Sequence, residues 1–157
     1  EDFIAPCYGG QSIAAGCSLV VGGVPSQDLS GSATSAAPDW TGTIGVSYET
    51  ELSSDLKFGT NVDMRYSDSY ISSSFGDPGT TQSSYAILDA GLRIGAADDS
   101  WQLALIGKNL TDKFYFTGGG TAPSTGSGTG TAAAVRGDAL GYGAFPRTVT
   151  VQATVRF

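Results

Sequence analysis

Apolar and polar residues alternate along five segments of this chain. The segments are 41–49, 56–70, 85–96, 101–116 and 147–157. Successive side chains of a β-strand point to opposite faces of a sheet, so a period of two predicts strands with two unlike faces. In the third segment, Leu88 and Leu92 share one predicted face, whereas Asp89 lies on the other. We therefore expect an all-β fold built from about five long antiparallel strands.

The predicted connections alternate between short and long. Polar turns at 49–55 and 95–100 are short. The long loops are expected at 1–39, 71–84 and 117–143. Within the fourth segment the alternation loses its phase near residues 107–112, which predicts a bulge or a bend.

Every predicted strand has an apolar face, and little remains in the sequence to cover it. In a soluble antiparallel sheet, a second sheet or a layer of helices buries that face. The remaining segments are rich in Gly, Ser, Thr and Ala and predict no amphipathic helix. In a transmembrane β-barrel, the apolar face contacts lipid and the polar face lines the lumen. The pattern therefore favours the membrane barrel, with the soluble sheet as the alternative.

The composition excludes several classes of function. Fifteen acidic and eight basic residues give a net charge of −7. This charge argues against a nucleic-acid partner, because phosphates require a basic surface. The chain contains no histidine, which rules out a Ser-His-Asp triad and a His-ligated metal site. We expect no enzymatic activity, no catalytic residue, no bound metal and no cofactor.

Cys7 and Cys17 are the two cysteines of the chain. Their spacing is not that of a zinc site or of a thioredoxin-like redox motif. An even number of cysteines in a Gly-rich stretch favours a disulfide formed in an oxidising compartment. Two free thiols are the alternative.

Several segments resemble one family of membrane proteins. GKNLTDKFYF at 107–116 and FPRTVTVQATVRF at 145–157 are similar to the C-terminal end of TonB-dependent outer-membrane receptors. APCYGGQSIAAGC at 5–17 and DLSGSATSAAPDWTGTIGVSYE at 28–49 resemble a disulfide-bearing surface loop and the strand after it in that family. The resemblance implies that the chain is a piece of a longer protein, whose barrel would have about 22 strands and a plugged lumen.

The resemblance also implies a domain organisation and an orientation. Residues 1–39 would form an extracellular loop with the disulfide, and 40–157 would form the C-terminal barrel strands. The loops at 71–84 and 117–143 would face the outside, and the two short turns would face the periplasm. The alternating C-terminal residues resemble the signal read by the barrel-assembly machinery, and a barrel strand that merely ends on Phe is the alternative. These residues are Val151, Ala153, Val155 and Phe157.

The implied function is uptake of a scarce nutrient across the outer membrane of a Gram-negative bacterium. The expected substrate classes are iron–siderophores, cobalamins and glycans, and the sequence selects none of them. The expected partners are the rest of the receptor barrel and outer-membrane lipid. The family's energy-coupling motif, its N-terminal plug and most of its barrel are not in this sequence. Transport is therefore not assigned to this chain acting alone.

Four charged residues on the predicted polar faces form a candidate ladder in the lumen. If the second and third strands pair residues whose numbers add to about 154–156, each acid lies opposite or diagonal to a base. We expect two ion pairs with a structural role, and a substrate relay is the alternative. The pairs are Asp63–Arg93 and Arg65–Asp89.

A second interpretation treats the chain as a complete molecular species. About five strands cannot close into a barrel, so the sheet would keep two unpaired edges and an apolar face. Copies would then pair edge to edge in an extracellular, amyloid-like cross-β filament with a structural or matrix role. The net charge of −7 opposes stacking of copies in register.

Overall fold

The computed structural model describes residues 2–122, 125 and 138–157, and over these residues the chain is all-β, as expected. The strands are β1 (Ile4–Pro6), β2 (Leu19–Val21), β3 (Val24–Asp28), β4 (Thr41–Ser53), β5 (Leu56–Ser67), β6 (Tyr70–Ile71), β7 (Thr81–Gln82), β8 (Tyr85–Ala96), β9 (Trp101–Lys108), β10 (Phe116–Ala122), β11 (Asp138–Gly143) and β12 (Thr148–Val155). Two short 3₁₀ helices are η1 (Ile13–Ala15) and η2 (Pro78–Thr80). Neither these nor any other helical segment in the described ranges is long and apolar enough to cross a membrane.

The chain divides into two compact units, each assembled from three segments. The sheet unit comprises Trp40–Asp68, Ser84–Tyr115 and Ala144–Phe157. The loop unit comprises Glu1–Asp39, Ser69–Ser83 and Phe116–Gly143. Residues 1–39 therefore belong to a larger body than the single N-terminal loop that the sequence suggested.

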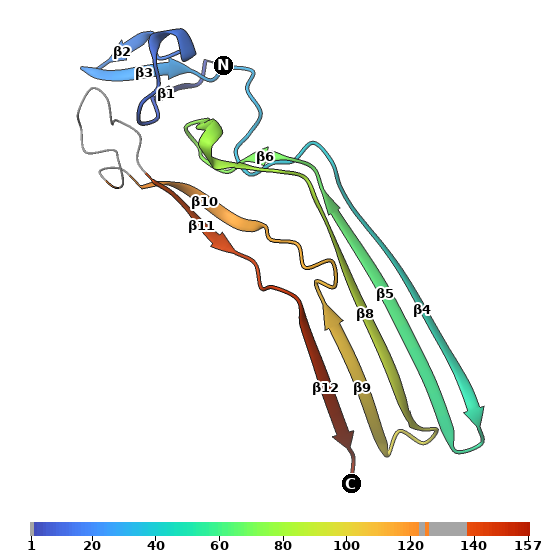
Figure 1. Ribbon diagram of the computed structural model, residues 1–157. Helices are drawn as coiled ribbons and strands as arrows, with labels where there is room; N and C mark the ends of the chain where they lie inside the picture. Colours follow the sequence, from blue (N-terminus) through green and yellow to red (C-terminus); the bar gives the residue numbers. More distant parts are fainter. Residues whose placement is uncertain (1, 123–124, 126–137) are drawn as a thin grey trace. The chain divides into compact units, whose positions relative to one another are not determined.

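The sheet unit is one antiparallel sheet with the strand order β12-β9-β8-β5-β4. Figure 1 shows these long strands side by side, with the β4–β5 turn, the β8–β9 turn and the C-terminus at the same end. Ala97 N–H donates to Asp55 O at 3.0 Å, which joins the two turns. Within the described residues, β4 and β12 each pair on one side only, so the sheet is open at both edges.

The five expected long strands correspond to β4, β5, β8, β9 and β12. β4 extends further than expected, to Ser53, and β5 ends earlier, at Ser67. The predicted bend is confirmed, since β9 ends at Lys108 and is followed by Asn109 and Asp112 with left-handed φ angles of 49° and 50°. Asn and Asp tolerate this conformation because their short polar side chains bond locally.

The segments expected as long loops contain short strands that the sequence analysis missed. In the loop unit, β1, β3 and β2 form a three-stranded sheet, β6 pairs with β7, and β10 pairs with β11. β1, β2, β3, β6 and β7 have two to five residues each, and the longer β10 and β11 are rich in glycine, so none of them shows a clear alternation. At Gly119 a Cβ would lie 2.6 Å from Leu140 O, so β10 and β11 approach closely where a side chain is absent. The part of the predicted loop at 123–124 and 126–137 lies outside the described residues.

Few apolar side chains are buried in either unit. The buried hydrophobic residues in the described ranges are Ala5, Ile87 and Ala96. Polar residues are buried more often, among them Gln27, Asp77, Asp89 and Asn109. No buried polar side-chain atom in the described ranges lacks a hydrogen-bond partner. Hydrogen bonds therefore hold the interior of each unit, and ion pairs around Asp89 add to them in the sheet unit.

Candidate functional site

The sheet unit has an apolar face whose residues form continuous rows across all five strands. Directly opposite residues of antiparallel strands project to the same face, so the register defines these rows. The rows carry no charged side chain. Three of them are Val46–Val62–Ala90–Gly107–Val149, Tyr48–Thr60–Leu92–Leu105–Val151 and Thr50–Phe58–Ile94–Leu103–Ala153.

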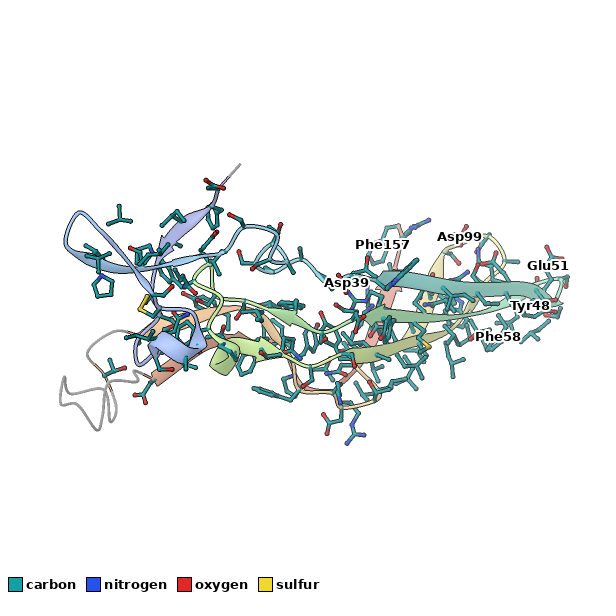
Figure 2. All side chains as sticks on the ribbon, turned by 90° about the horizontal axis from the view of Figure 1, so that it is seen from above. Asp39, Tyr48, Glu51, Phe58, Asp99 and Phe157 are labelled. Atoms are coloured by element: carbon teal, nitrogen blue, oxygen red, sulfur yellow. A yellow bond between two sulfur atoms is a disulfide. The ribbon has the colours of Figure 1, made fainter. Side chains whose placement is uncertain are left out.

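This apolar face is exposed, whereas the polar face is partly buried. Val46 and Val151 on the apolar face are 68% and 67% exposed, but Ile87 and Asp89 on the polar face are 3% and 6% exposed. In Figure 2, the apolar-face residue Tyr48 lies at the end of the sheet that bears the short turns. A water-soluble antiparallel sheet has the reverse arrangement, with its apolar face against a core.

Glycines on the polar face leave room for long side chains from the neighbouring strands. A Cβ at Gly45 would lie 2.6 Å from Asp63 Oδ1. Gly59 lies directly opposite Arg93, and a Cβ there would lie 2.7 Å from the guanidinium carbon of that arginine. The Asp63 and Arg93 side chains therefore lie along the sheet over backbone, and this arrangement buries much of the polar face.

The predicted Asp63–Arg93 ion pair is wrong. Gly59 rather than Asp63 lies opposite Arg93, and Arg93 Nη2 donates to Glu49 Oε2 at 2.6 Å. Asp63 instead accepts a hydrogen bond from Asn61 Nδ2 at 3.0 Å. A register shift of two residues leaves every side chain on the same face. The alternation of the sequence therefore could not distinguish the observed register from the expected one.

Asp89 is the centre of the polar network in the sheet unit. Asp63 lies directly opposite Asp89, and like charges at such a position are unfavourable without nearby cations. Arg65 Nη2 lies 3.6 Å from Asp89 Oδ2, so the second predicted pair is present. Lys108 Nζ donates to the same oxygen at 3.0 Å, and the Asn109 N–H donates to Oδ1 at 2.8 Å.

Asn109 is a structural residue that the sequence analysis did not identify. Its side-chain Nδ2 donates to Lys113 O at 2.9 Å and to Phe145 O at 3.2 Å, and its Oδ1 accepts the Lys113 N–H at 2.9 Å. The side chain thus joins the bend after β9 to the segment before β12. The loss of phase in GKNLTD was the available signal, because a left-handed bend favours Asn.

The β8–β9 turn carries a charged cluster of its own. Asp99 in the β8–β9 turn pairs with Lys57 of β5. The hydrogen bond from the Lys57 ammonium and the charge of that group lower the pKa of the Asp99 carboxyl. Hydrogen bonds from Ser100 lower the pKa of the neighbouring Asp98. Both aspartates therefore favour their ionised form in the folded chain.

The predicted assembly signal lies in the edge strand β12 and just beyond it. Val151, Ala153 and Val155 lie on the exposed apolar face, and Val155 is opposite Trp101. Phe157 follows the end of β12 and is fully exposed. Its recognition by an assembly machinery stays a prediction.

The Cys7–Cys17 disulfide is confirmed, with the two Cα atoms 5.7 Å apart. It closes a short loop that contains η1. Gln27 of β3, which is buried, connects this region to the β6–β7 connection. Its Nε2 donates to Pro6 O at 3.1 Å and to Phe75 O at 2.8 Å.

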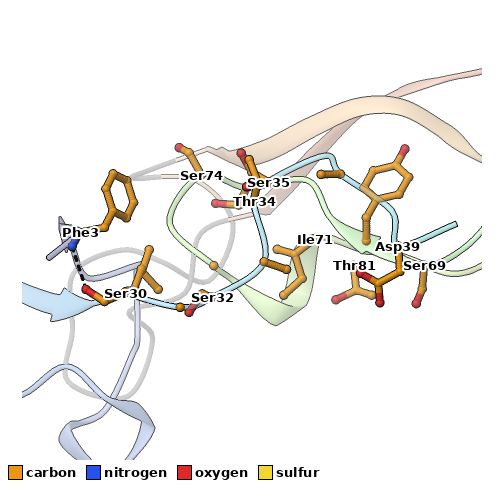
Figure 3. Close-up of a pocket in the computed structure, with 17 residues that line it drawn as sticks. Phe3, Ser30, Ser32, Thr34, Ser35, Asp39, Ser69, Ile71, Ser74 and Thr81 are labelled. Carbon is orange, nitrogen blue, oxygen red and sulfur yellow. Dashed lines mark hydrogen bonds between the residues drawn. The ribbon is translucent and has the colours of Figure 1, made fainter. Parts of the chain in front are cut away.

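The loop unit contains a pocket of about 690 Å³, lined mainly by the segments 29–39 and 69–81 (Figure 3). Of the 17 described residues that line it, eight are serine or threonine, and the one charged residue among these 17 is Asp39. Phe3 also lines it, and the backbone fixes this residue in place. The Phe3 N–H donates to Ser30 Oγ at 2.8 Å, and the Leu29 N–H donates to Phe3 O at 2.9 Å.

Hydrogen bonds fix the pocket walls as well. The Ala36 N–H donates to Ile71 O at 2.8 Å, and Ala36 adopts a left-handed φ of 55°. On the β6–β7 side, the Ser73 N–H donates to Thr80 Oγ1 at 3.1 Å, and that hydroxyl donates to Asp77 O at 2.7 Å. These hydrogen bonds connect the segment 29–39 to the β6–β7 connection and stabilise the pocket walls.

The described residues thus present an exposed apolar sheet face, a polar face with ion pairs and a hydroxyl-rich pocket. No family model, curated protein or solved structure matches this chain.

Proposed function

We propose that this chain is the C-terminal part of a TonB-dependent outer-membrane receptor that takes up a scarce nutrient. The observation that carries the proposal is the inverted burial of the two sheet faces. Rows of apolar side chains such as Val46 and Val151 are exposed, and the face that holds Asp89 is the more buried one. Lipid is the solvent that an exposed apolar face requires, and a lumen is the environment that a charged face requires.

The open edges of the sheet support the same proposal. A strand inside a bilayer cannot leave its backbone N–H and C=O groups unpaired, because no water is present to bind them. In the receptor, strands from the rest of the barrel would pair with the free edges of β4 and β12. The two short turns and the C-terminus lie at the same end of the sheet. This arrangement supports a periplasmic rim at that end, with the longer connections toward the outside.

The proposal is tested by asking which face of β12 contacts lipid. Trp40 and Trp101 are the two tryptophans of the chain and are replaced by Phe. A single Trp is then placed at Val151 or at Gln152, which are neighbours on opposite faces. The variants are made in the full-length protein, with any further tryptophans also replaced by Phe, and are reconstituted in vesicles whose acyl chains carry bromine, a quencher of tryptophan fluorescence. We expect strong quenching for V151W and weak quenching for Q152W.

A second matched pair on the other edge strand repeats the measurement. Val46 and Ser47 are neighbours on opposite faces of β4, and V46W should be quenched more strongly than S47W. Equal quenching within both pairs, or stronger quenching at Gln152 and Ser47, would contradict the proposal.

A second candidate function is a self-assembling extracellular filament. The observation that favours it is that β4 and β12 both have a free edge, which copies of the chain could join. Electron microscopy of the chain in lipid-free buffer separates the two functions. Regular filaments of the intact chain in buffer, with no quenching in brominated vesicles, would favour the filament over the receptor.

A further inference from the structure

We infer that the pocket of the loop unit binds a neutral, polyhydroxylated ligand, namely a short oligosaccharide. This inference rests on the proposed function, because it selects one substrate class for that receptor. The pocket volume of about 690 Å³ lies within the range of ordinary small-molecule sites. The composition of its walls decides the class.

The pocket offers hydroxyl groups that the protein itself does not use. The side chains of Ser32, Thr34 and Ser35 line the pocket in Figure 3 and make no hydrogen bond to any described residue. A hydroxyl both donates and accepts, so a row of hydroxyls matches the hydroxyls of a sugar without demanding a charge. Asp39 adds one carboxylate, which accepts hydrogen bonds from two ligand hydroxyls at once.

The charge of the loop unit argues against an anionic ligand. The segments of this unit contain six acidic residues and one basic residue, Arg136, which gives a formal charge of −5. Among the described residues, no lysine or arginine lines the pocket. Recognition of a phosphate or of a carboxylate-bearing iron chelate calls for cationic side chains or a cluster of N–H groups. Such ligands would meet repulsion here, whereas a neutral sugar would not.

Phe3 supplies the apolar part of the site. Phe3 is 57% exposed, and its backbone is held by Ser30 and Leu29. The C–H face of a sugar ring packs against an aromatic ring, while the hydroxyls at the edge of the sugar remain free for polar partners. Figure 3 shows Phe3 and Asp39 at opposite ends of the pocket, so a ligand that contacts both must extend along it. This separation favours an oligosaccharide over a single sugar.

The test uses the full-length protein reconstituted in vesicles and isothermal titration calorimetry. The probes are maltotriose, cellotriose, xylotriose and mannotriose, with ferric citrate and trigalacturonic acid as anionic comparators. We expect saturable binding of at least one neutral trisaccharide and none of the two anions. Binding of neither class, or preferential binding of an anion, overturns the inference.

Two variants place the binding in the pocket. Ser35→Trp fills the pocket and should abolish the binding, whereas Ser18→Trp adds the same ring at an exposed position outside it and should leave the affinity unchanged. Asp39→Asn keeps the shape and should weaken binding about tenfold, the effect of losing one charge-assisted hydrogen bond. Asp55→Asn in the β4–β5 turn is its control. The inference is overturned if S35W and D39N both bind the trisaccharide with the same affinity as the unaltered chain.

The result is separable from that of the fluorescence test, which reports on the sheet unit. Loss of saccharide binding with the expected quenching pattern refutes the ligand class and leaves the receptor standing. Saccharide binding without that quenching pattern refutes the receptor, and with it the transport role given to the pocket.

Discussion

Arg93 reaches Glu49 across an intervening strand. The two residues lie on β8 and β4, and β5 runs between them with Gly59 at the position of crossing. Arg93 Nη2 and Glu49 Oε2 are 2.6 Å apart because no side chain stands between them. The ion pair therefore depends on a residue that takes no part in it.

Gly59→Ala should break this arrangement. A Cβ at Gly59 would displace the Arg93 side chain, and we expect a loss of about 1–3 kcal/mol of unfolding free energy. Gly42→Ala on β4 is the matched control, because nothing lies within 4 Å of a Cβ there. Urea unfolding in vesicles measures both. The cost of Glu49→Gln should also become smaller in the G59A background, and an unchanged cost would contradict the dependence on Gly59.

Asp89→Ala should destabilise the sheet unit more than Asp89→Asn. The alanine leaves the buried Asn109 N–H without its acceptor, at a cost of about 1–3 kcal/mol. The asparagine keeps an oxygen in that place. Asp63→Asn removes the like charge opposite Asp89 and should be neutral or stabilising. The same unfolding measurement ranks the three, and equal costs for D89A and D89N would show that the acceptor is unimportant.

Ala36→Gly should stabilise the loop unit by about 1 kcal/mol. Ala36 has a φ of 55°, which an L-residue adopts at a cost and glycine adopts freely. Ala37→Gly, one residue further, has no such strain to relieve and should cost stability instead. If the left-handed conformation is strained in the folded chain, the unfolding temperature rises in A36G and falls in A37G.

The turn cluster should make stability depend on pH in the acid range. The pKa of Asp99 is lowered by Lys57, so its contribution is present above the pKa of the unfolded chain and is lost as the pH falls through the folded value, below about pH 4. The effect is small because the pair is exposed. Asp99→Asn tolerates the same left-handed φ and should remove this part of the dependence. Asp55→Asn should leave it in place when unfolding is followed from pH 6 to 2.5.

Removal of the disulfide should loosen the loop unit and leave the sheet unit unchanged. The bond joins residues ten apart, and on the chain-entropy model a loop of this size is worth about 2–3 kcal/mol. The double variant Cys7→Ser, Cys17→Ser should therefore exchange its amide hydrogens faster in β1, β2 and β3. Faster exchange in β8 or β9 as well would mean that the two units do not unfold independently.

The faces of the sheet could be predicted from the sequence, but the register could not. A period of two assigns Leu92 and Arg93 to opposite faces wherever the strand is placed. A shift of β8 by two residues against β5 changes every cross-strand partner but leaves each side chain on the same face. In the observed register, Arg93 therefore pairs with Glu49 and not with Asp63. The partner depended on Gly59, whose role is visible only when three strands are seen together.

The pocket was beyond the reach of sequence patterns for a different reason. Phe3, Ser35 and Ser74 are far apart in the chain, and the hydrogen bonds that gather them involve backbone groups. Backbone hydrogen bonds of this kind do not require a periodic pattern of side chains, so a stretch of Ser, Thr and Gly does not reveal them. For the two cysteines the sequence favoured the observed disulfide over two free thiols, and the structure confirms it.

The free edges of β4 and β12 make the stability of this fold a property of its surroundings. Whatever adds a strand to either edge binds the folded sheet and not the unfolded chain, so it shifts the folding equilibrium by mass action. The unfolding midpoint should therefore rise with the concentration of that partner instead of being a constant of the sequence. An unfolding experiment on the dilute, isolated chain would therefore give the lowest value of this midpoint.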